Sequence, residues 1–203
     1  MIQLYHGDCL EEIRKIPDKS VDLVLTDPPY GIDFQSSRIK DKGRRKEKIA
    51  NDKKPFIDFI KEIPRVVKET GAVVVFSRWD VQQAFIDKME RCGMKPRGVL
   101  IWDKGGGGMG DLKRAWALDY ETAIYWTADG FEFQHGRPGS SVIKSAKVPA
   151  EQLTHPNEKP VDLLRYIIGE MCVRGVPSWI ALWAADPAAR RRKRAEDGSL
   201  ALS

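Results

Sequence analysis

Four consecutive residues, Asp27-Pro28-Pro29-Tyr30, carry the groups that chemistry on an amino group needs. An exocyclic amino group on adenine or cytosine is a poor nucleophile, because its lone pair is delocalised into the ring. Methylation of that nitrogen therefore requires acceptors for its N–H bonds. The Asp27 carboxylate and the Pro28 carbonyl are two acceptors at adjacent positions, and Tyr30 offers a ring on which an extruded base can stack. Because both prolines restrict the backbone, we expect the acceptors to be held rigidly.

The segment before these residues predicts the element that positions them. Val21–Thr26 is an apolar run typical of a buried strand, and it must end at the prolines, which have no N–H for a ladder. In open α/β sheets, ligands bind at the carboxyl ends of strands, where Asp27 would then lie. Residue patterns predict further strands over 2–6, 71–76, 97–103 and 120–127, and helices beginning after Asp8, near Pro55, at Gln82 and at Pro160. Strands that alternate with helices predict an α/β fold with a mainly parallel sheet.

Length and composition are those of one globular domain of 203 residues. No apolar run is long enough to cross a bilayer, and the first residues lack the pattern of a signal peptide. The three cysteines, Cys9, Cys92 and Cys172, fit neither a disulfide framework nor a zinc site. We therefore expect a cytoplasmic protein with no membrane partner and no metal.

The positive charge of the chain is concentrated in one segment without apolar periodicity. Between Arg38 and Lys54, nine basic and three acidic residues give 9 − 3 = +6, which exceeds the net charge of +5 of the whole chain. Such a segment suits a polyanion such as nucleic acid, and it equally suits a solvated loop without a partner.

Four motifs of the chain resemble those of the amino-directed, S-adenosylmethionine-dependent DNA methyltransferases, and they follow one another in the order found in that family. Asp-Pro-Pro-Tyr after an apolar strand looks like the catalytic motif of that family. Leu4–Cys9 resembles the segment whose aspartate lies beside the cofactor's adenosine, Tyr120–Trp126 resembles the late hairpin strand, and His155–Pro160 is similar to the His-Pro-x-x-Lys-Pro segment beside the methionine end of the cofactor. A catalytic motif that precedes the cofactor motif is the arrangement of the β subgroup.

The resemblance, which covers residues 1–172, implies a fold and a set of functional residues. The fold would be a Rossmann-like S-adenosylmethionine-dependent methyltransferase fold, with a terminal antiparallel hairpin strand and an incomplete C-terminus. Asp8 fits two roles, as helix N-cap and as cofactor neighbour. Residues 35–54 would be a target-contacting insertion for double-stranded DNA. The catalytic residues would be Asp27, Pro28, Pro29 and Tyr30, the cofactor-binding residues Asp8, Asp27, His155, Pro156, Lys159 and Pro160, and the DNA-binding residues Arg38, Lys40, Lys42, Arg44, Arg45 and Lys46.

The last motif of that family, a strand ending in Asp-Pro-Phe-x-Gly-x-Gly, does not follow Cys172. Asp186-Pro187 has no glycine after it until Gly198, and the chain continues into an arginine-rich run. Our hypothesis is a changed reading frame in residues 173–203. The shifted frame joins the last base of each codon to the first two bases of the next codon. Read in this way, the Trp179–Ile180 junction must encode Asp, and the Trp183–Ala184 junction must encode Gly. We therefore expect residues 173–203 to form an atypical tail that continues no sheet.

The function implied by the resemblance is transfer of a methyl group from S-adenosylmethionine to the exocyclic amino group of a flipped base. Adenine N6 is favoured, because aspartate leads the motif where serine is commoner in cytosine-amino enzymes. The alternatives are a cytosine-N4 DNA methyltransferase, a truncated non-catalytic nucleic-acid-binding remnant, and an RNA methyltransferase with the same motif. Such an enzyme would act alongside a restriction enzyme or be encoded by a phage.

Overall fold

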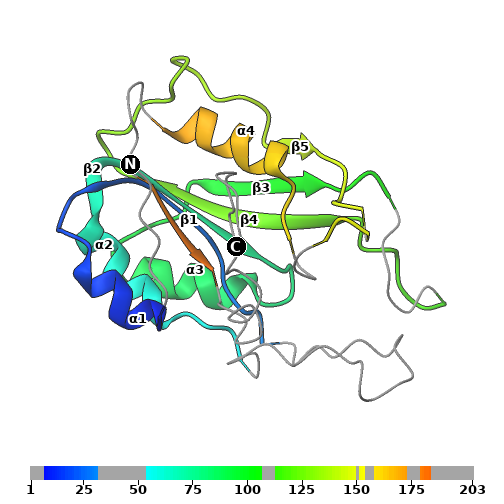
Figure 1. Ribbon diagram of the computed structural model, residues 1–203, viewed down its shortest axis with the longest axis horizontal. Coiled ribbons are helices and arrows are strands. Elements are labelled where there is room, and N and C mark those ends of the chain that lie inside the picture. The colour runs from blue at the N-terminus through cyan, green and yellow to red at the C-terminus, as the bar shows by residue number, and fades with distance from the viewer. Residues whose placement is uncertain are drawn as a thin grey trace.

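In the part of the chain that the computed structural model describes, six strands form one sheet with helices on both faces (Figure 1). The described residues are 7–31, 54–106, 113–149, 151–153 and 158–172, together with the backbone of 179–183. The strands are β1 (Val21–Asp27), β2 (Val67–Ser77), β3 (Gly98–Asp103), β4 (Tyr120–Thr127), β5 (Val142–Lys144) and β6 (Trp179–Trp183). The helices are α1 (Cys9–Glu12), α2 (Ile63–Val66), α3 (Gln82–Arg91) and α4 (Val161–Met171), and short 3-10 turns cover Ile13–Lys15 and Asp58–Glu62.

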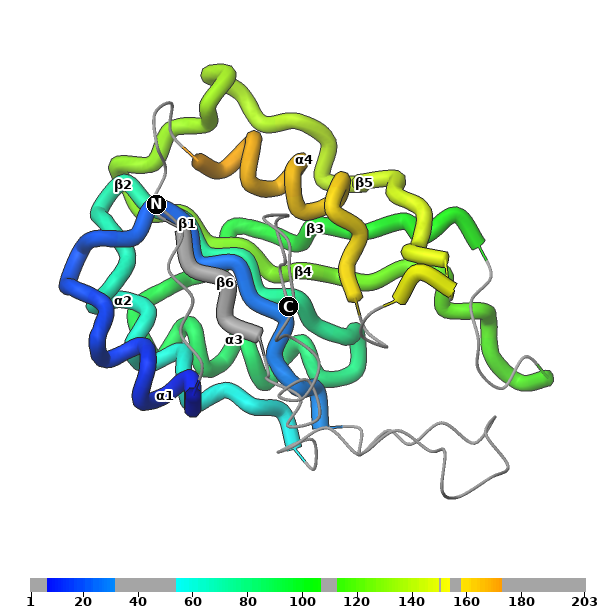
Figure 2. Tube along the Cα trace, viewed as in Figure 1, coloured from blue at the N-terminus to red at the C-terminus, as the bar shows by residue number. Residues whose placement is uncertain are grey.

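The sheet is mainly parallel, as the alternation of strands and helices predicts. Its order is β5-β3-β4-β2-β1-β6, and β4 pairs antiparallel with both of its neighbours while the remaining pairs are parallel. The antiparallel strand differs from our expectation in place, because β4 lies inside the sheet and not at its end. Figure 2 shows the chain of β4 running back between β3 and β2.

Helices cover both faces of the sheet because alternate side chains of its central strands point to opposite sides. Val24 and Val73 point toward the face covered by α1, α2 and α3, where Phe85 and Met89 of α3 complete a buried cluster. Leu23, Leu25, Val74 and Phe76 point toward α4, whose buried residues Leu163, Leu164 and Ile167 form the second cluster. Figure 2 shows α4 on one side of the sheet and the other helices opposite it.

The N-cap prediction is confirmed, while the helix expected near Pro55 is shorter than its sequence pattern. Asp8 accepts a hydrogen bond at 2.8 Å from the Leu10 backbone N–H at the start of α1. Pro64 lies in the first turn of α2 and does not kink a longer helix, which agrees with the preference of proline for that position. The segment after Ser141, for which the sequence pattern predicts no element, contributes the short edge strand β5.

The expectation that nothing after Cys172 joins the sheet is wrong. Residues Trp179–Trp183 form β6, which pairs parallel with β1 in a register that sets Leu23 beside Trp179 and Asp27 beside Trp183 (Figure 1). The reason is local: Trp-Ile-Ala-Leu-Trp is a short, continuous apolar run, and Trp and Ile are residue types enriched in strands. Our expectation weighed the missing glycines and overlooked this run.

The sheet brings several polar residues to one edge. Asp27 ends β1, Ser77 ends β2, and Asp103 ends β3. Because β4 runs the opposite way, its first residues reach the same edge, where Asp103 pairs with Tyr120 and Ser77 with Thr122. The strand predicted over residues 2–6 lies outside the described residues. Within the described residues, no helix is long and apolar enough to span a membrane.

Candidate active site

The carboxylate of Asp27 is held on both of its oxygens. The Tyr30 hydroxyl donates a short hydrogen bond to Oδ1, and the Lys159 ammonium donates one at 2.7 Å to Oδ2. The Asp27 side chain is 10% exposed and that of Lys159 is 4% exposed. A carboxylate oxygen has two lone pairs, so each oxygen of Asp27 keeps the capacity to accept one further hydrogen bond.

The period of the strands explains why these groups meet. Asp27 follows Leu23 and Leu25 at intervals of two, so its side chain points to the face of the sheet that α4 covers. Lys159 comes directly before Pro160, the N-cap of α4, and its ammonium lies 5.0 Å from the ring centre of Phe76. The Asp27 carboxylate therefore receives the lysine from the segment that leads into α4, on the same face of the sheet.

Glu121 is the second carboxylate in contact with Lys159. Its Oε2 lies 3.1 Å from the Lys159 ammonium, and its Oε1 pairs with the ammonium of Lys104, which follows β3. Oε2 is buried and makes no well-directed hydrogen bond within the described residues, although the ion-pair distance to Lys159 is short. The contact is therefore mainly one of charge, and Oε2 retains acceptor capacity.

Charge and burial shift three pKa values of this cluster in directions that keep Lys159 and Glu121 ionised and Tyr30 neutral. Burial lowers the pKa of Lys159, but the charges of Asp27 and Glu121 outweigh burial and raise it above its ordinary value. Burial raises the pKa of Glu121, but the ammonium groups of Lys159 and Lys104 outweigh burial and lower it. Burial, followed by the negative charges of Asp27 and Glu121, raises the pKa of Tyr30 well above its ordinary value. Tyr30 thus stays a hydrogen-bond donor at physiological pH.

The two proline carbonyls after Asp27 differ in their hydrogen bonds: that of Pro29 has a partner and that of Pro28 has none among the described residues. The Pro29 carbonyl accepts a hydrogen bond at 3.0 Å from the Phe56 N–H, and Tyr30 forms an isolated antiparallel bridge with Pro55. Among the described residues, no donor reaches the Pro28 carbonyl. Two acceptors with spare capacity, the Asp27 carboxylate and the Pro28 carbonyl, therefore follow one another at the edge of the sheet.

The comparisons with known proteins agree with this geometry. The profile of a family described as DNA methylase matches residues 21–175, more than half of the chain. The chain belongs to this DNA methylase family.

The segments of known relatives that match this chain make up only part of each relative. The DNA adenine methyltransferase YhdJ of Escherichia coli K12 is 26% identical over 153 residues, which make up 73% of this chain and 48% of YhdJ. The type II methyltransferase M.BglII of Bacillus subtilis is 28% identical over 145 residues, 62% of this chain and 35% of M.BglII. The chain thus spans about half the length of the first relative and about a third of the second.

Solved structures support the fold. The M1.HpyAVI–SAM complex superposes with a TM-score of 0.63 at 21% identity, over 89% of this chain and 82% of that one. The cytosine-N4-specific PvuII DNA methyltransferase superposes with a TM-score of 0.64 at 15% identity, over 90% and 81%. Both agree with the Rossmann-like methyltransferase fold that the sequence motifs predict.

The structure places the sequence-predicted residues of this DNA methylase in three groups. Asp27, Tyr30 and Lys159 meet in one cluster, with Pro28, Pro29 and Pro160 buried beside them. Asp8 is exposed, and its carboxylate caps the N-terminus of α1. The remaining predicted residues lie outside the described part of the chain: His155, Pro156, Arg38, Lys40, Lys42, Arg44, Arg45 and Lys46.

Sequence reasoning missed Glu121 and Lys104. A signal for Glu121 exists, because it precedes Ala123 by two residues on a strand and therefore shares the core-facing side. A charged residue at a core-facing strand position needs a partner of opposite sign, and Lys159 and Lys104 provide it. Lys104 gives no comparable signal, since it follows β3 at the start of a glycine-rich connection.

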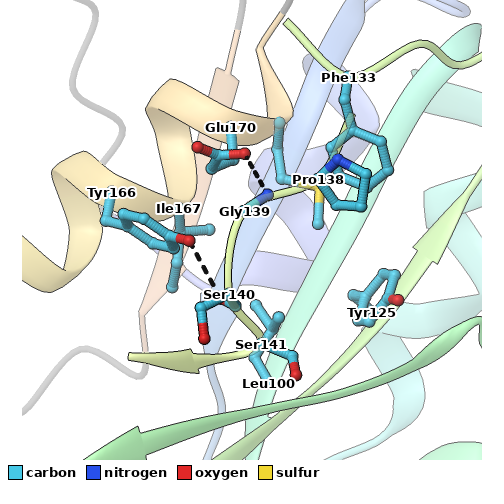
Figure 3. A pocket seen from close by; sticks show the side chains of 11 residues that line it. Leu100, Tyr125, Phe133, Pro138, Gly139, Ser140, Ser141, Tyr166, Ile167 and Glu170 are labelled. Carbon is cyan, nitrogen blue, oxygen red and sulfur yellow. Dashed lines mark hydrogen bonds between the residues drawn. The ribbon is translucent and has the colours of Figure 1, made fainter. Parts of the chain in front are cut away.

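The apolar pocket between α4 and residues 133–141 is separate from this cluster (Figure 3). Glu170 Oε2 accepts a hydrogen bond at 2.9 Å from the Gly139 N–H, and the Tyr166 hydroxyl donates one at 3.0 Å to the Ser140 carbonyl. The volume of this pocket is about 50 Å³, far below the roughly 300 Å³ of the smallest usual ligand pockets. The two hydrogen bonds indicate that this region anchors a loop on α4.

The cluster around Asp27 fits a cationic cofactor. Asp27 and Glu121 are balanced by Lys159 and Lys104, and Glu121 Oε2 adds a buried acceptor without a directed donor. A site with no excess positive charge and spare acceptors accommodates a sulfonium without electrostatic repulsion. The described residues contain no group of three or more side chains that could hold a metal ion.

Proposed function

We propose that this chain carries the catalytic part of an S-adenosylmethionine-dependent DNA methyltransferase that modifies the exocyclic amino group of a flipped base. The observation that carries the proposal is the Asp27 carboxylate, fixed at the end of β1 by Tyr30 and Lys159 beside the Pro28 carbonyl. The relatives YhdJ and M.BglII, named as DNA methyltransferases, support the same reaction.

The side chains suggest how the reaction proceeds. Asp27 and the Pro28 carbonyl accept hydrogen bonds from the amino group, which localises the nitrogen lone pair and aims it at the methyl donor. Bound S-adenosylmethionine supplies the electrophilic methyl group, so a nitrogen–carbon bond forms as a sulfur–carbon bond breaks. The amino nitrogen then releases a proton, which Asp27 accepts. The ring of Tyr30 offers a surface on which the base stacks.

Adenine N6 is the favoured target, and cytosine N4 is the second candidate. Aspartate at the start of the motif supports adenine, as does similarity to YhdJ, which is named a DNA adenine methyltransferase. Cytosine N4 is the second candidate because the cytosine-N4-specific PvuII enzyme has a similar fold. Transfer to duplexes containing only one of the two methylatable bases decides between them.

Two parts of the chain suit a DNA partner. One is the basic set between Arg38 and Lys46, which lies outside the described residues. The other is the segment before β4, which projects from the end of the sheet in Figure 1 and carries Trp116, 95% exposed, close to Lys113 and Arg114. An exposed aromatic side chain among basic residues, at the edge that holds the active site, is typical of surfaces that contact nucleic acid.

The proposal includes a cofactor side and a cellular setting. Asp8, His155, Pro156, Lys159 and Pro160 would line the S-adenosylmethionine site, as the motif resemblance implies. Double-stranded DNA would be the substrate, in the cytoplasm, and the type II relatives support a restriction-modification setting.

Methyl transfer from radiolabelled S-adenosylmethionine to duplex DNA tests the function. We expect incorporation by the purified chain and a fall of about 10²-fold or more in Asp27→Ala, the range seen when one essential hydrogen-bonding group is removed. Asp22→Ala is the matched control, because Asp22 lies on the same strand but forms its ion pair with Lys68. Incorporation that survives Asp27→Ala would refute the mechanism.

The second candidate function is a nucleic-acid-binding remnant without catalysis. The absence of the Asp-Pro-Phe-x-Gly-x-Gly motif after Cys172 favours it. Calorimetric titration with S-adenosylmethionine separates the two functions, because a catalytic chain must bind the cofactor and a remnant need not. Duplex DNA and RNA of the same sequence, compared as substrates, test the RNA methyltransferase alternative.

A further inference from the structure

Glu121 has no role in the mechanism above, yet it is the group that shares Lys159 with the catalytic carboxylate. Lys159 is buried between Asp27 Oδ2, at 2.7 Å, and Glu121 Oε2, at 3.1 Å. The other oxygen of Glu121 pairs with Lys104. The three side chains of Lys159, Lys104 and Glu121 are 4%, 12% and 20% exposed, so water screens their charges weakly.

The charges of the cluster cancel. Asp27 and Glu121 contribute two negative charges, and Lys159 and Lys104 contribute two positive charges. Removing the charge of Glu121 leaves one positive charge in excess beside Asp27. That excess has two consequences: Lys159 then pairs with Asp27 alone, and the site repels a cationic sulfonium.

We propose that Glu121 is a positioning residue for methyl transfer, acting through Lys159. By drawing part of the lysine's charge away, Glu121 keeps the Asp27 carboxylate fixed in direction yet available to the substrate amino group. A lysine that paired with Asp27 alone would bind the carboxylate more tightly and weaken its capacity to accept the amino hydrogen bond. The proposal rests on the methyltransferase function proposed above.

The test is a double-mutant cycle on methyl-transfer rate. Glu121→Gln keeps the shape and removes the charge, and we expect kcat to fall about tenfold or more, which corresponds to about 1.4 kcal/mol of barrier, with the KM for DNA little changed. In a Lys159→Met background the same substitution should change kcat less than twofold, because residues that act through one another are not additive.

Two variants separate positioning from a loss of folding. Asp22→Asn removes the charge of another partly buried ion pair, Asp22–Lys68 at 2.8 Å, at the opposite end of β1, and should leave kcat within about twofold of the parent, as expected of a site with no shared partner. Glu121→Asp keeps the charge and should recover part of the lost rate. The proposal is overturned if Glu121→Gln transfers methyl groups at the parent rate, or if its loss is equally large in the Lys159→Met background.

A second measurement does not need an active enzyme. The Lys159 ammonium can be titrated by nitrogen-detected NMR in the parent and in Glu121→Gln. If Glu121 shares Lys159, its removal lowers the pH at which this ammonium loses its proton, and an unchanged titration overturns the proposal. A parent chain without methyl-transfer activity would refute the proposed function for this chain, and the NMR comparison would then decide only whether Glu121 shares the charge of Lys159.

Discussion

Gly31, which directly follows the Asp27–Tyr30 segment, offers a quantitative test of how tightly that segment is held. Its backbone has a φ of +80°, which favours glycine over all other residues. A Cβ atom at this position would lie 2.4 Å from the backbone carbon of Lys54 and 2.6 Å from the nitrogen of Pro55. Those atoms belong to the chain that bridges to Tyr30 and hydrogen-bonds Pro29, so they cannot move away without disturbing both contacts.

The expected cost of Gly31→Ala has two parts. Left-handed backbone geometry costs a residue with a Cβ about 1–2 kcal/mol. Displacement of the Lys54–Pro55 backbone adds loss of the Phe56–Pro29 hydrogen bond, about 0.5–1.5 kcal/mol. We therefore expect the free energy of unfolding to fall by about 1.5–3.5 kcal/mol, and the Tyr30–Asp27 hydrogen bond to be disturbed with it.

Gly93→Ala is the matched control. Gly93 has a φ of +79°, nearly that of Gly31, but a Cβ atom there would meet nothing within 4 Å. Urea unfolding of the two variants should therefore differ by the contact part alone, about 0.5–1.5 kcal/mol, with Gly31→Ala the less stable. Equal losses in the two variants would show that Gly31 does not approach Lys54 as closely as the structure indicates.

Two further predictions concern Cys172 and the coding sequence. Burial, followed by the charge of Asp22, raises the pKa of Cys172 to about 11, so the stability this thiol contributes is present below its unfolded pKa of about 8.5 and is lost as the pH rises through 11. The urea stability of Cys172→Ala should thus fall less between pH 8 and pH 11 than that of the parent, and parallel losses would contradict the assignment. In the coding DNA, we expect the shifted frame after Cys172 to read Asp-x-Phe-Met-Gly-Ser-Gly from Trp179 onward, and a shifted frame without that string would remove the hypothesis.

Patterns local to the chain were sufficient for most elements. The apolar run from Val21 that ends at two prolines is strand β1. The helix expected to begin at Gln82 is α3, and the strand expected over 120–127 is β4. These elements have strong signals, either helical spacing of Phe85 and Met89 or a continuous run of strand-forming residues. The carboxylate of Asp27 could likewise be placed at a strand end from sequence alone.

Other features depend on contacts that the local pattern does not contain. The strand β5 has three residues, and it exists because Val142–Lys144 pairs with the edge of β3. The position of β4 inside the sheet follows from its pairing with both β2 and β3, which are distant in sequence. Lys159 was expected beside the cofactor, whereas its contacts with Asp27 and Glu121 join residues 132 and 38 positions away.

The contrast between Asp27 and Glu121 shows where motif reading ends and sheet geometry begins. Asp27 is recognisable because prolines and an aromatic residue follow it in an order that chemistry explains. Glu121 is preceded by an ordinary tyrosine and followed by an ordinary strand, and its importance arises because β4 runs antiparallel and carries its first residues to the edge where β1 ends. If the double-mutant cycle couples Glu121 to Lys159, the catalytic unit of this chain is a charge network spread over β1, β3, β4 and the start of α4. The motif from Asp27 to Tyr30 then supplies its acceptors, and the antiparallel strand sets how strongly Lys159 binds them.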